Sequence, residues 1–136
     1  MNPQKFMASI YLGDRSIEKI IIDNDNKSVS IQIDRVSRVR GSQWNFYDKE
    51  DIVHGNLVFE GAKAFLVQPP GPIPNAWIEF VGVEKEESET NIELYVFKFA
   101  SASIGDSPAQ TEVSIFITAT AVYLQDPSVP DVRIVE

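Results

Sequence analysis

The segment TEVSIFITATAVYL, from Thr111 to Leu124, carries the pattern that determines the fold class. Its odd positions from 113 onward are all apolar: Val113, Ile115, Ile117, Ala119, Ala121 and Tyr123. Most of the even positions between them are polar, beginning with Glu112 and Ser114. Successive side chains of a β-strand point to opposite faces, so a period of two indicates a strand with one face on a core. The segment therefore predicts one long strand whose odd positions are buried.

The rest of the chain carries further strand patterns. β-Branched runs or apolar–polar alternation predict strands at residues 19–23, 28–34, 56–60, 64–68, 76–84, 92–100 and 132–135. The link from Asp23 to Lys27 consists of turn-forming residues and predicts a β-hairpin. Residues 92–99 are apolar at both parities, which predicts a central strand covered on both faces. Because the links are short and lack helical crossovers, we expect mostly antiparallel pairing.

Two segments depart from the strand pattern. Asn2 followed by Pro3 is typical of a helix N-cap and first turn, so a short helix is predicted from Pro3 to about Ser9. After Asp34 the apolar positions shift to even parity at Val36, which indicates a bulge or the end of pairing, and residues 36–55 lack a regular pattern. Together these features predict a mainly β fold over residues 1–136. The predicted fold class is a single-domain antiparallel β-sandwich or partly open barrel with one short N-terminal helix.

Composition narrows the classes of function. The 136 residues contain no cysteine, which excludes disulfides, thiolate metal sites and cysteine nucleophiles. The formal net charge of −8 disfavours binding to nucleic acid or to an anionic membrane and favours a basic partner. The N-terminal residues lack the apolar core of a signal peptide, and no segment approaches the ~20 apolar residues needed to cross a bilayer. A cytoplasmic location is therefore expected.

The residues that could support catalysis or metal binding lack the necessary partners. His54 is the only histidine, so a zinc site would have to combine one imidazole with carboxylates alone. The run from Asp23 resembles the start of a calcium loop, but the fifth, sixth and twelfth positions hold Lys27, Ser28 and Asp34. No pair of carboxylates is singled out by its spacing. We therefore expect no catalytic residue, no metal and no cofactor.

Two patches are candidates for binding a partner. Arg38 and Arg40 come shortly before Trp44, and arginine and aromatic residues are enriched at binding hot spots. The alternative is that these arginines pair with the abundant carboxylates while the aromatic residues fill the edge of the core. The second patch is acidic and lies at the predicted tip of a hairpin; it comprises Glu84, Glu86, Glu87 and Glu89. It is either a solvated turn or a surface for a basic target.

Several short segments carry a resemblance to a known family. They are Ile10 to Arg15, Trp44 to Tyr47, Gly55 to Gly61 and Tyr123 to Pro127. They resemble those of a small bacterial family of unknown function, which is similar in size and outline to the immunity proteins of polymorphic-toxin systems. The matching residues are turn glycines, core aromatics and a terminal turn. The resemblance implies no catalytic residue.

These observations lead to one expectation about function and three alternatives. We expect a non-enzymatic acidic binding domain that captures a basic protein partner, with the role of an immunity or inhibitor protein suggested by the resemblance. The alternatives are a β-barrel that binds a small ligand among its aromatic residues and a structural protein. An enzyme that uses only carboxylates ranks third.

Overall fold

A computed structural model describes residues 2–40, 43–44, 50–71, 73, 77–87, 91–102 and 112–136, with the backbone alone described at 43–44. The chain forms one short helix and ten strands within these ranges. They are α1 (Pro3–Ala8), β1 (Ile10–Tyr11), β2 (Ile17–Asp23), β3 (Ser28–Arg40), β4 (Gln43–Trp44), β5 (Ile52–Glu60), β6 (Ala64–Gln68), β7 (Trp77–Glu86), β8 (Leu94–Ala102), β9 (Glu112–Ala119) and β10 (Ala121–Gln125).

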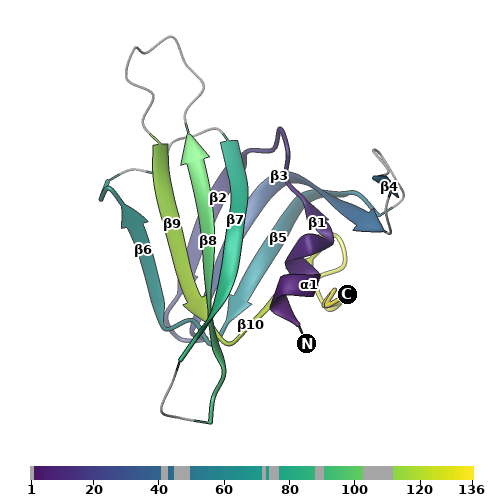
Figure 1. The fold of residues 1–136 in the computed structure, drawn as a ribbon. Helices are drawn as coiled ribbons and strands as arrows, with labels where there is room; N and C mark the ends of the chain where they lie inside the picture. The colour runs from purple at the N-terminus through teal and green to yellow at the C-terminus, as the bar shows by residue number, and fades with distance from the viewer. Residues whose placement is uncertain are drawn as a thin grey trace.

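The strands build two antiparallel sheets that face each other (Figure 1). One sheet has the order β1-β3-β5-β10, and β2 and β4 also pair with β3. The other sheet has the order β6-β9-β8-β7, which makes β6 and β7 its edge strands. The fold is therefore mainly β, as predicted, and fits a β-sandwich or partly open barrel.

The core lies between the two sheets and is rich in aromatic rings. Phe59 of β5 meets Phe97 and Phe99 of β8 edge to face, with ring centroids 4.9 and 5.9 Å apart. All three side chains are fully buried. Edge-to-face packing of this kind adds about 0.5–1.5 kcal/mol per pair beyond the burial of area. These rings occupy the space between the sheets.

The prediction of one long strand from Thr111 to Leu124 is wrong in its second half. The chain leaves β9 at Ala119 and enters β10 at Ala121 in the other sheet, while Thr111 itself lies outside the described residues. The buried side chains change from odd to even positions at this point. In β9 the buried residues are Val113, Ile115, Ile117 and Ala119. In β10 they are Val122 and Leu124, whereas Ala121 and Tyr123 are only partly buried.

The change of sheet occurs where two links lie against each other. The backbone N–H and the hydroxyl of Thr120 both donate to the carbonyl of Glu60, at 2.9 and 3.0 Å. Gly61 follows with a φ of +59°, and a Cβ there would lie 2.4 Å from Oγ1 of Thr120. Only glycine meets both demands without strain. The β5–β6 and β9–β10 links therefore connect the two sheets side by side.

Other local predictions are confirmed or corrected. Asn2 caps α1 by accepting a hydrogen bond from the N–H of Lys5 (3.1 Å), and Pro3 begins the helix. The predicted hairpin is formed by β2 and β3, and the Oδ1 of Asp23 accepts from the N–H groups of Asp25 and Asn26. The predicted C-terminal strand at residues 132–135 is wrong, because a single bridge from Ile134 to Leu124 replaces it.

The segment predicted to be irregular is partly regular. Pairing of β3 with β2 ends at Ile33, as the parity change indicated, but β3 itself continues to Arg40. The bulge lies on β2, at Glu18, and β5 begins at Ile52, before the predicted Gly55 boundary. β8 is a central strand, as predicted, but only one of its faces is buried. The prediction that both faces are covered is therefore wrong.

Candidate functional site

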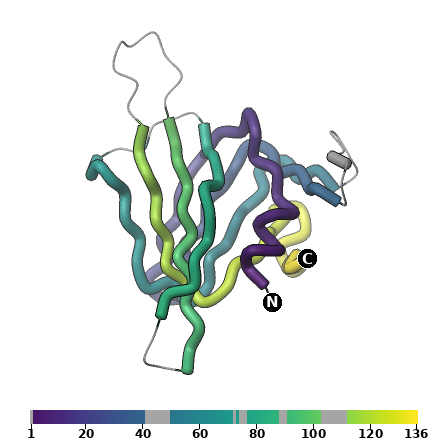
Figure 2. The backbone as a smooth tube through the Cα atoms, viewed as in Figure 1, coloured from purple at the N-terminus to yellow at the C-terminus, as the bar shows by residue number. Residues whose placement is uncertain are grey.

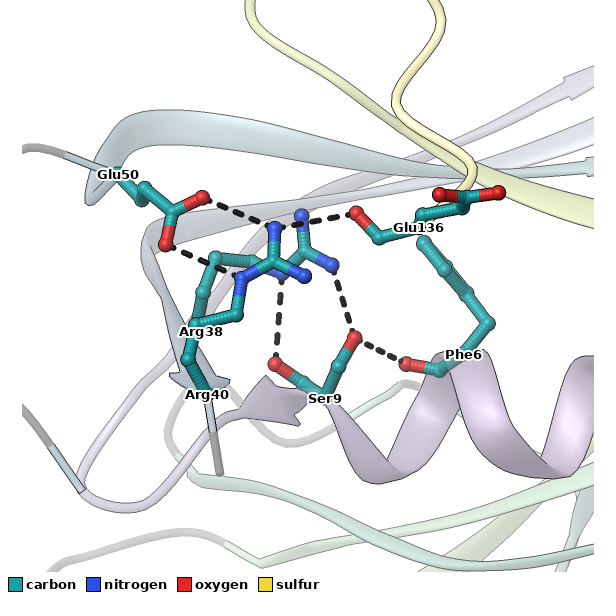
Figure 3. A network of polar contacts seen from close by, with 6 residues as sticks. All are labelled: Phe6, Ser9, Arg38, Arg40, Glu50 and Glu136. Atoms are coloured by element: carbon teal, nitrogen blue, oxygen red, sulfur yellow. Dashed lines mark hydrogen bonds and ion pairs between the residues drawn. The ribbon is translucent and has the colours of Figure 1, made fainter. Parts of the chain in front are cut away.

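Arg40, at the end of β3, forms a bidentate ion pair with Glu50 (Figure 3). Its Nε and Nη2 donate to the two carboxylate oxygens of Glu50 at 3.1 and 2.9 Å. Nη2 also donates to the main-chain oxygen of Glu136 at 3.2 Å. The hydrogen bonds from Arg40 lower the pKa of Glu50 below its ordinary value. Arg40 thus ties the end of β3 to the last residue of the chain.

Arg38 lies next to this pair but is buried, with 3% of its surface exposed. Its Nη2 donates to the hydroxyl of Ser9 at 2.8 Å, and its Nε donates to the carbonyl of Ser9 at 3.4 Å. The guanidinium lies 5.6 Å from the centre of the Phe6 ring. Burial, with a smaller effect of the charge on Arg40, lowers the pKa of Arg38. These contacts fasten the end of α1 to β3, which favours a structural role for Arg38.

The third residue of this patch, Trp44, is described only through its backbone. β4 pairs Trp44 with Val39 of β3 in an antiparallel bridge, and the side chain lies outside the described residues. The two ends of the chain lie close together (Figure 2), and Arg40 bonds to Glu136 there. A cavity of about 610 Å³ there is lined by Lys5, Phe6, Arg40 and Glu136, among others. Its lining charges are of both signs.

The acidic patch lies on the edge strand β7 and just beyond it. Glu84, Glu86 and Glu87 are all exposed, and Glu89 lies outside the described residues. Glu84 pairs with Val96 and Glu86 pairs with Leu94 of β8. These β8 positions alternate with the buried side chains of the strand, so both glutamates lie on the outward face of the sheet.

Lys85 does not neutralise the acidic patch. Its Nζ lies 3.0 Å from the Oε1 of Glu93, and the hydroxyl of Tyr95 donates to the other oxygen of Glu93 at 2.7 Å. The hydrogen bonds from Tyr95 and Lys85 lower the pKa of Glu93. The carboxylates of Glu84, Glu86 and Glu87 form no ion pair within the described chain. Among the described residues, no ion pair offsets these three side chains.

The structure adds neighbours that the sequence did not single out. Trp77 and Val81, also on β7, are about half exposed, at 52% and 51%. Glu79 is exposed and pairs with Ala100, which places it on the same outward face as Glu84 and Glu86. The alternation of Ile78 and Phe80 with Trp77 and Glu79 is the signal that could have identified Trp77 and Glu79 as exposed. The arginine patch is on the other sheet, so the two candidate patches do not form one surface (Figure 1).

The candidate metal ligands His54 and Asp23 both contact other groups of the protein. His54 lies within β5 and its Nδ1 is 2.6 Å from the Oε1 of Glu18, and both side chains are partly exposed. The carboxylate of Asp23 accepts hydrogen bonds from its own turn. In the part of the chain that the structure describes, no group of three histidine, cysteine or acidic side chains is arranged to hold a metal ion. Over the same residues, no helix is long and apolar enough to span a membrane.

Comparison with known proteins places the whole chain in one family. A family model described as "Family of unknown function (DUF6258)" matches residues 1–136. No curated protein and no solved structure matches the chain significantly. The predicted likeness to a family of unknown function is thus confirmed at that level. The chain belongs to the family of unknown function DUF6258.

Proposed function

We propose that this protein is a non-enzymatic binding domain that captures a basic protein partner along the outward face of β7. One observation carries the proposal. The exposed carboxylates of Glu79, Glu84 and Glu86 share an edge strand with the exposed apolar side chains of Trp77 and Val81. Glu87 extends the acidic row beyond the strand.

The unpaired carboxylates supply the long-range part of recognition. The net charge of the chain is −8, and the charges on β7 are not cancelled by the neighbouring lysine. Complementary charge raises the rate at which partners meet and contributes less to how long they stay together. A basic surface would therefore be guided to this edge of the sheet.

The apolar side chains and the free strand edge supply the short-range part. A large, half-exposed aromatic such as Trp77 is typical of an energetic anchor in an interface. β7 pairs with β8 on one side only, and beyond the Ser16–Trp77 bridge its other edge has no strand partner among the described residues. An extended segment of a partner can hydrogen-bond to such an edge.

The barrel alternative is less well supported. The rings of Phe59, Phe97 and Phe99 pack against one another between the sheets, where a ligand barrel needs open volume. The likeness in size and outline to immunity proteins suggests a finer form of the proposal, in which the basic partner is a toxin that the protein inhibits. A toxin gene next to the gene for this protein would support that form.

The test is a charge reversal with a matched control. Glu84→Lys, Glu86→Lys and Glu87→Lys are combined in one variant, and Asp25→Lys, Asp131→Lys and Glu136→Lys are combined in the control. The six carboxylates are all exposed, so both variants change the net charge equally. Basic proteins retained from the source cells by the immobilised native chain are purified and used as the probe.

Binding kinetics are then measured at low and moderate salt. We expect the β7 variant to associate about tenfold more slowly at low salt, with a smaller difference at higher salt because ions screen exposed charges. The control variant should associate at nearly the native rate. Equal slowing by both variants would contradict a specific role for β7 and leave only a general effect of net charge.

A further inference from the structure

A cleft lies directly beside the start of β7. It has a volume of about 480 Å³ and is formed by α1, β1, the turn after β1 and the first residues of β7. Its lining combines polar and apolar surface, and the apolar side chains of Met7, Leu12 and Ile78 in it are buried. Trp77 and Tyr11 belong to the same lining. The volume lies in the range of sites that enclose a small molecule or a side chain.

Local backbone geometry builds one side of this cleft. The N–H of Arg15 donates to the carbonyl of Leu12 at 3.1 Å, and Asp14 adopts a φ of +57° in the turn between them. A Cβ on Gly13 would lie 2.2 Å from the hydroxyl oxygen of Tyr11, so the Tyr11 side chain packs over this turn. A larger residue at Gly13 would require the Tyr11 side chain to move.

The turn is tied to β7 by main-chain hydrogen bonding. The N–H of Ile78 donates to the carbonyl of Arg15 at 3.1 Å, and Ser16 and Trp77 form a β-bridge. These bonds fix the distance between the two walls of the cleft. The Ser16–Trp77 bridge lies on the free edge of β7. A partner segment that paired with this edge would therefore pass the opening of the cleft.

The charged residues that line the cleft are both acidic. Asp14 and Glu79 are exposed, and neither forms an ion pair within the described chain. The neighbouring cation, Arg15, donates from Nη2 to the hydroxyl of Ser37 at 2.8 Å and lies 5.9 Å from the centre of the Tyr11 ring. Buried apolar side chains beside two exposed carboxylates complement a side chain that has an aliphatic stem and a cationic end.

We infer that this cleft receives a lysine or arginine side chain from an extended segment of the basic partner, and this inference rests on the proposed function. The methylene groups would contact the buried apolar side chains of the lining and Trp77. The cationic end would lie at the rim with Asp14 and Glu79, because long basic side chains bury their stems and keep their charge near water or a counter-ion. The main chain of the segment would run beside β7.

The experiment uses a defined probe, an acetylated and amidated seven-residue peptide of alternating valine and lysine. The chain has two tryptophans, so a Trp44→Phe background leaves Trp77 as the single tryptophan reporter. We expect the peptide to shift the fluorescence of Trp77 saturably. A peptide with norleucine in place of lysine has the same stem without the charge, and we expect it to bind about tenfold more weakly.

Matched variants locate the effect in the cleft. A variant that combines Asp14→Asn with Glu79→Gln should bind the lysine peptide about tenfold more weakly than the background protein does. It should bind the norleucine peptide with the same affinity as the background protein. This loss of discrimination is the sign of a direct pairing. Ala8 is an exposed residue of α1 that lines the cleft. Ala8→Phe therefore places a ring in the cleft and should abolish binding of both peptides. Asp131→Asn and Ala64→Phe, at exposed sites that do not line the cleft, should bind both peptides normally.

The outcomes separate this inference from the proposed function. Tighter binding of the norleucine peptide, or an unchanged affinity in the Asp14→Asn, Glu79→Gln and Ala8→Phe variants, would overturn the cleft as a cation site. The same would follow if the lysine peptide produced no saturable change. Slower association of the β7 charge-reversal variant with its captured partner would still support the proposed function in each of these cases.

Discussion

His54 of β5 and Glu18 of β2 meet across β3, with 2.6 Å between Nδ1 and Oε1. Both residues stand where their strands are irregular: Glu18 lies at the bulge of β2, and His54 has a φ of +58°. A positive φ is unfavourable for a residue with a Cβ. The contact is partly exposed, so it contributes at most about 1 kcal/mol to stability.

Substitutions at His54 should separate backbone strain from the loss of this contact. His54→Gly relieves the strain while it removes the contact, so we expect a change in the free energy of unfolding below about 1 kcal/mol. His54→Val places a β-branched residue at positive φ and should destabilise by about 1–3 kcal/mol. Urea unfolding measures both. Equal stability of the two variants would show that the backbone relaxes at this position.

Ile117 and Thr118 test the two faces of β9. Ile117 is fully buried, whereas Thr118 is partly exposed and lies opposite Val96 and Ala64 on the outward face. Ile117→Asp puts an unpaired charge into the core and should prevent stable folding, whereas Thr118→Asp should cost less than about 1 kcal/mol. Thermal unfolding compares the variants. Similar melting temperatures would contradict the assignment of faces.

Gly61 should be far less tolerant of alanine than Gly82. Gly61→Ala requires a strained φ of +59° and a Cβ 2.4 Å from Oγ1 of Thr120, and we expect a loss of about 2 kcal/mol or more. Gly82 has open space where a Cβ would lie and no positive φ, so Gly82→Ala is the matched control and should be close to neutral. Chemical denaturation measures both. A neutral Gly61→Ala would show that the two links between the sheets are not in tight contact.

Arg38 should matter more for stability than the exposed Arg40. Arg38→Ala leaves a cavity and removes the hydrogen bonds to Ser9, so we expect a loss of about 2–4 kcal/mol. Arg38→Met keeps most of the volume without a buried charge and should cost about 1 kcal/mol. Arg40→Ala removes a partly exposed ion pair and should cost less than about 1 kcal/mol. Equal effects at the two arginines would contradict the structural role assigned to Arg38.

The ion pair of Glu50 should make stability depend on acid pH. Arg40 lowers the pKa of Glu50 in the folded protein below its ordinary value of 4.5, so the folded state binds its proton less readily than the unfolded state. The contribution is therefore present above about pH 4.5 and is lost as the pH falls through the lowered pKa. Because Glu50 is largely exposed, the effect should stay below about 1 kcal/mol.

Glu50→Gln is the variant that checks this pH dependence. It cannot titrate, so the difference in stability from the native chain should be present at neutral pH and should shrink toward pH 3. Urea unfolding at a series of pH values measures it. A difference that is the same at both ends of the series would show that the Arg40–Glu50 pair does not contribute through charge.

Much of the local structure followed from the sequence because it depends on neighbouring residues. The cap of α1 needs only Asn2 and Pro3, and the β2–β3 hairpin needs only the turn residues between Asp23 and Ser28. The burial of Val113 to Ala119 follows from the period of two. The sequence also placed Glu84, Glu86 and Glu87 at an exposed hairpin, since charged residues beside a turn rarely enter a core.

Tertiary structure alone decided the features that depend on distant partners. Apolar–polar alternation continues across Thr120, and the chain changes sheet there because Thr120 packs against Gly61 and bonds to Glu60. Arg38 is buried because Ser9 and Phe6 accommodate its guanidinium. The position of β7 at an edge is likewise a property of strand order. Strand order is set by which apolar faces pack together across the whole core, and no local pattern contains that information.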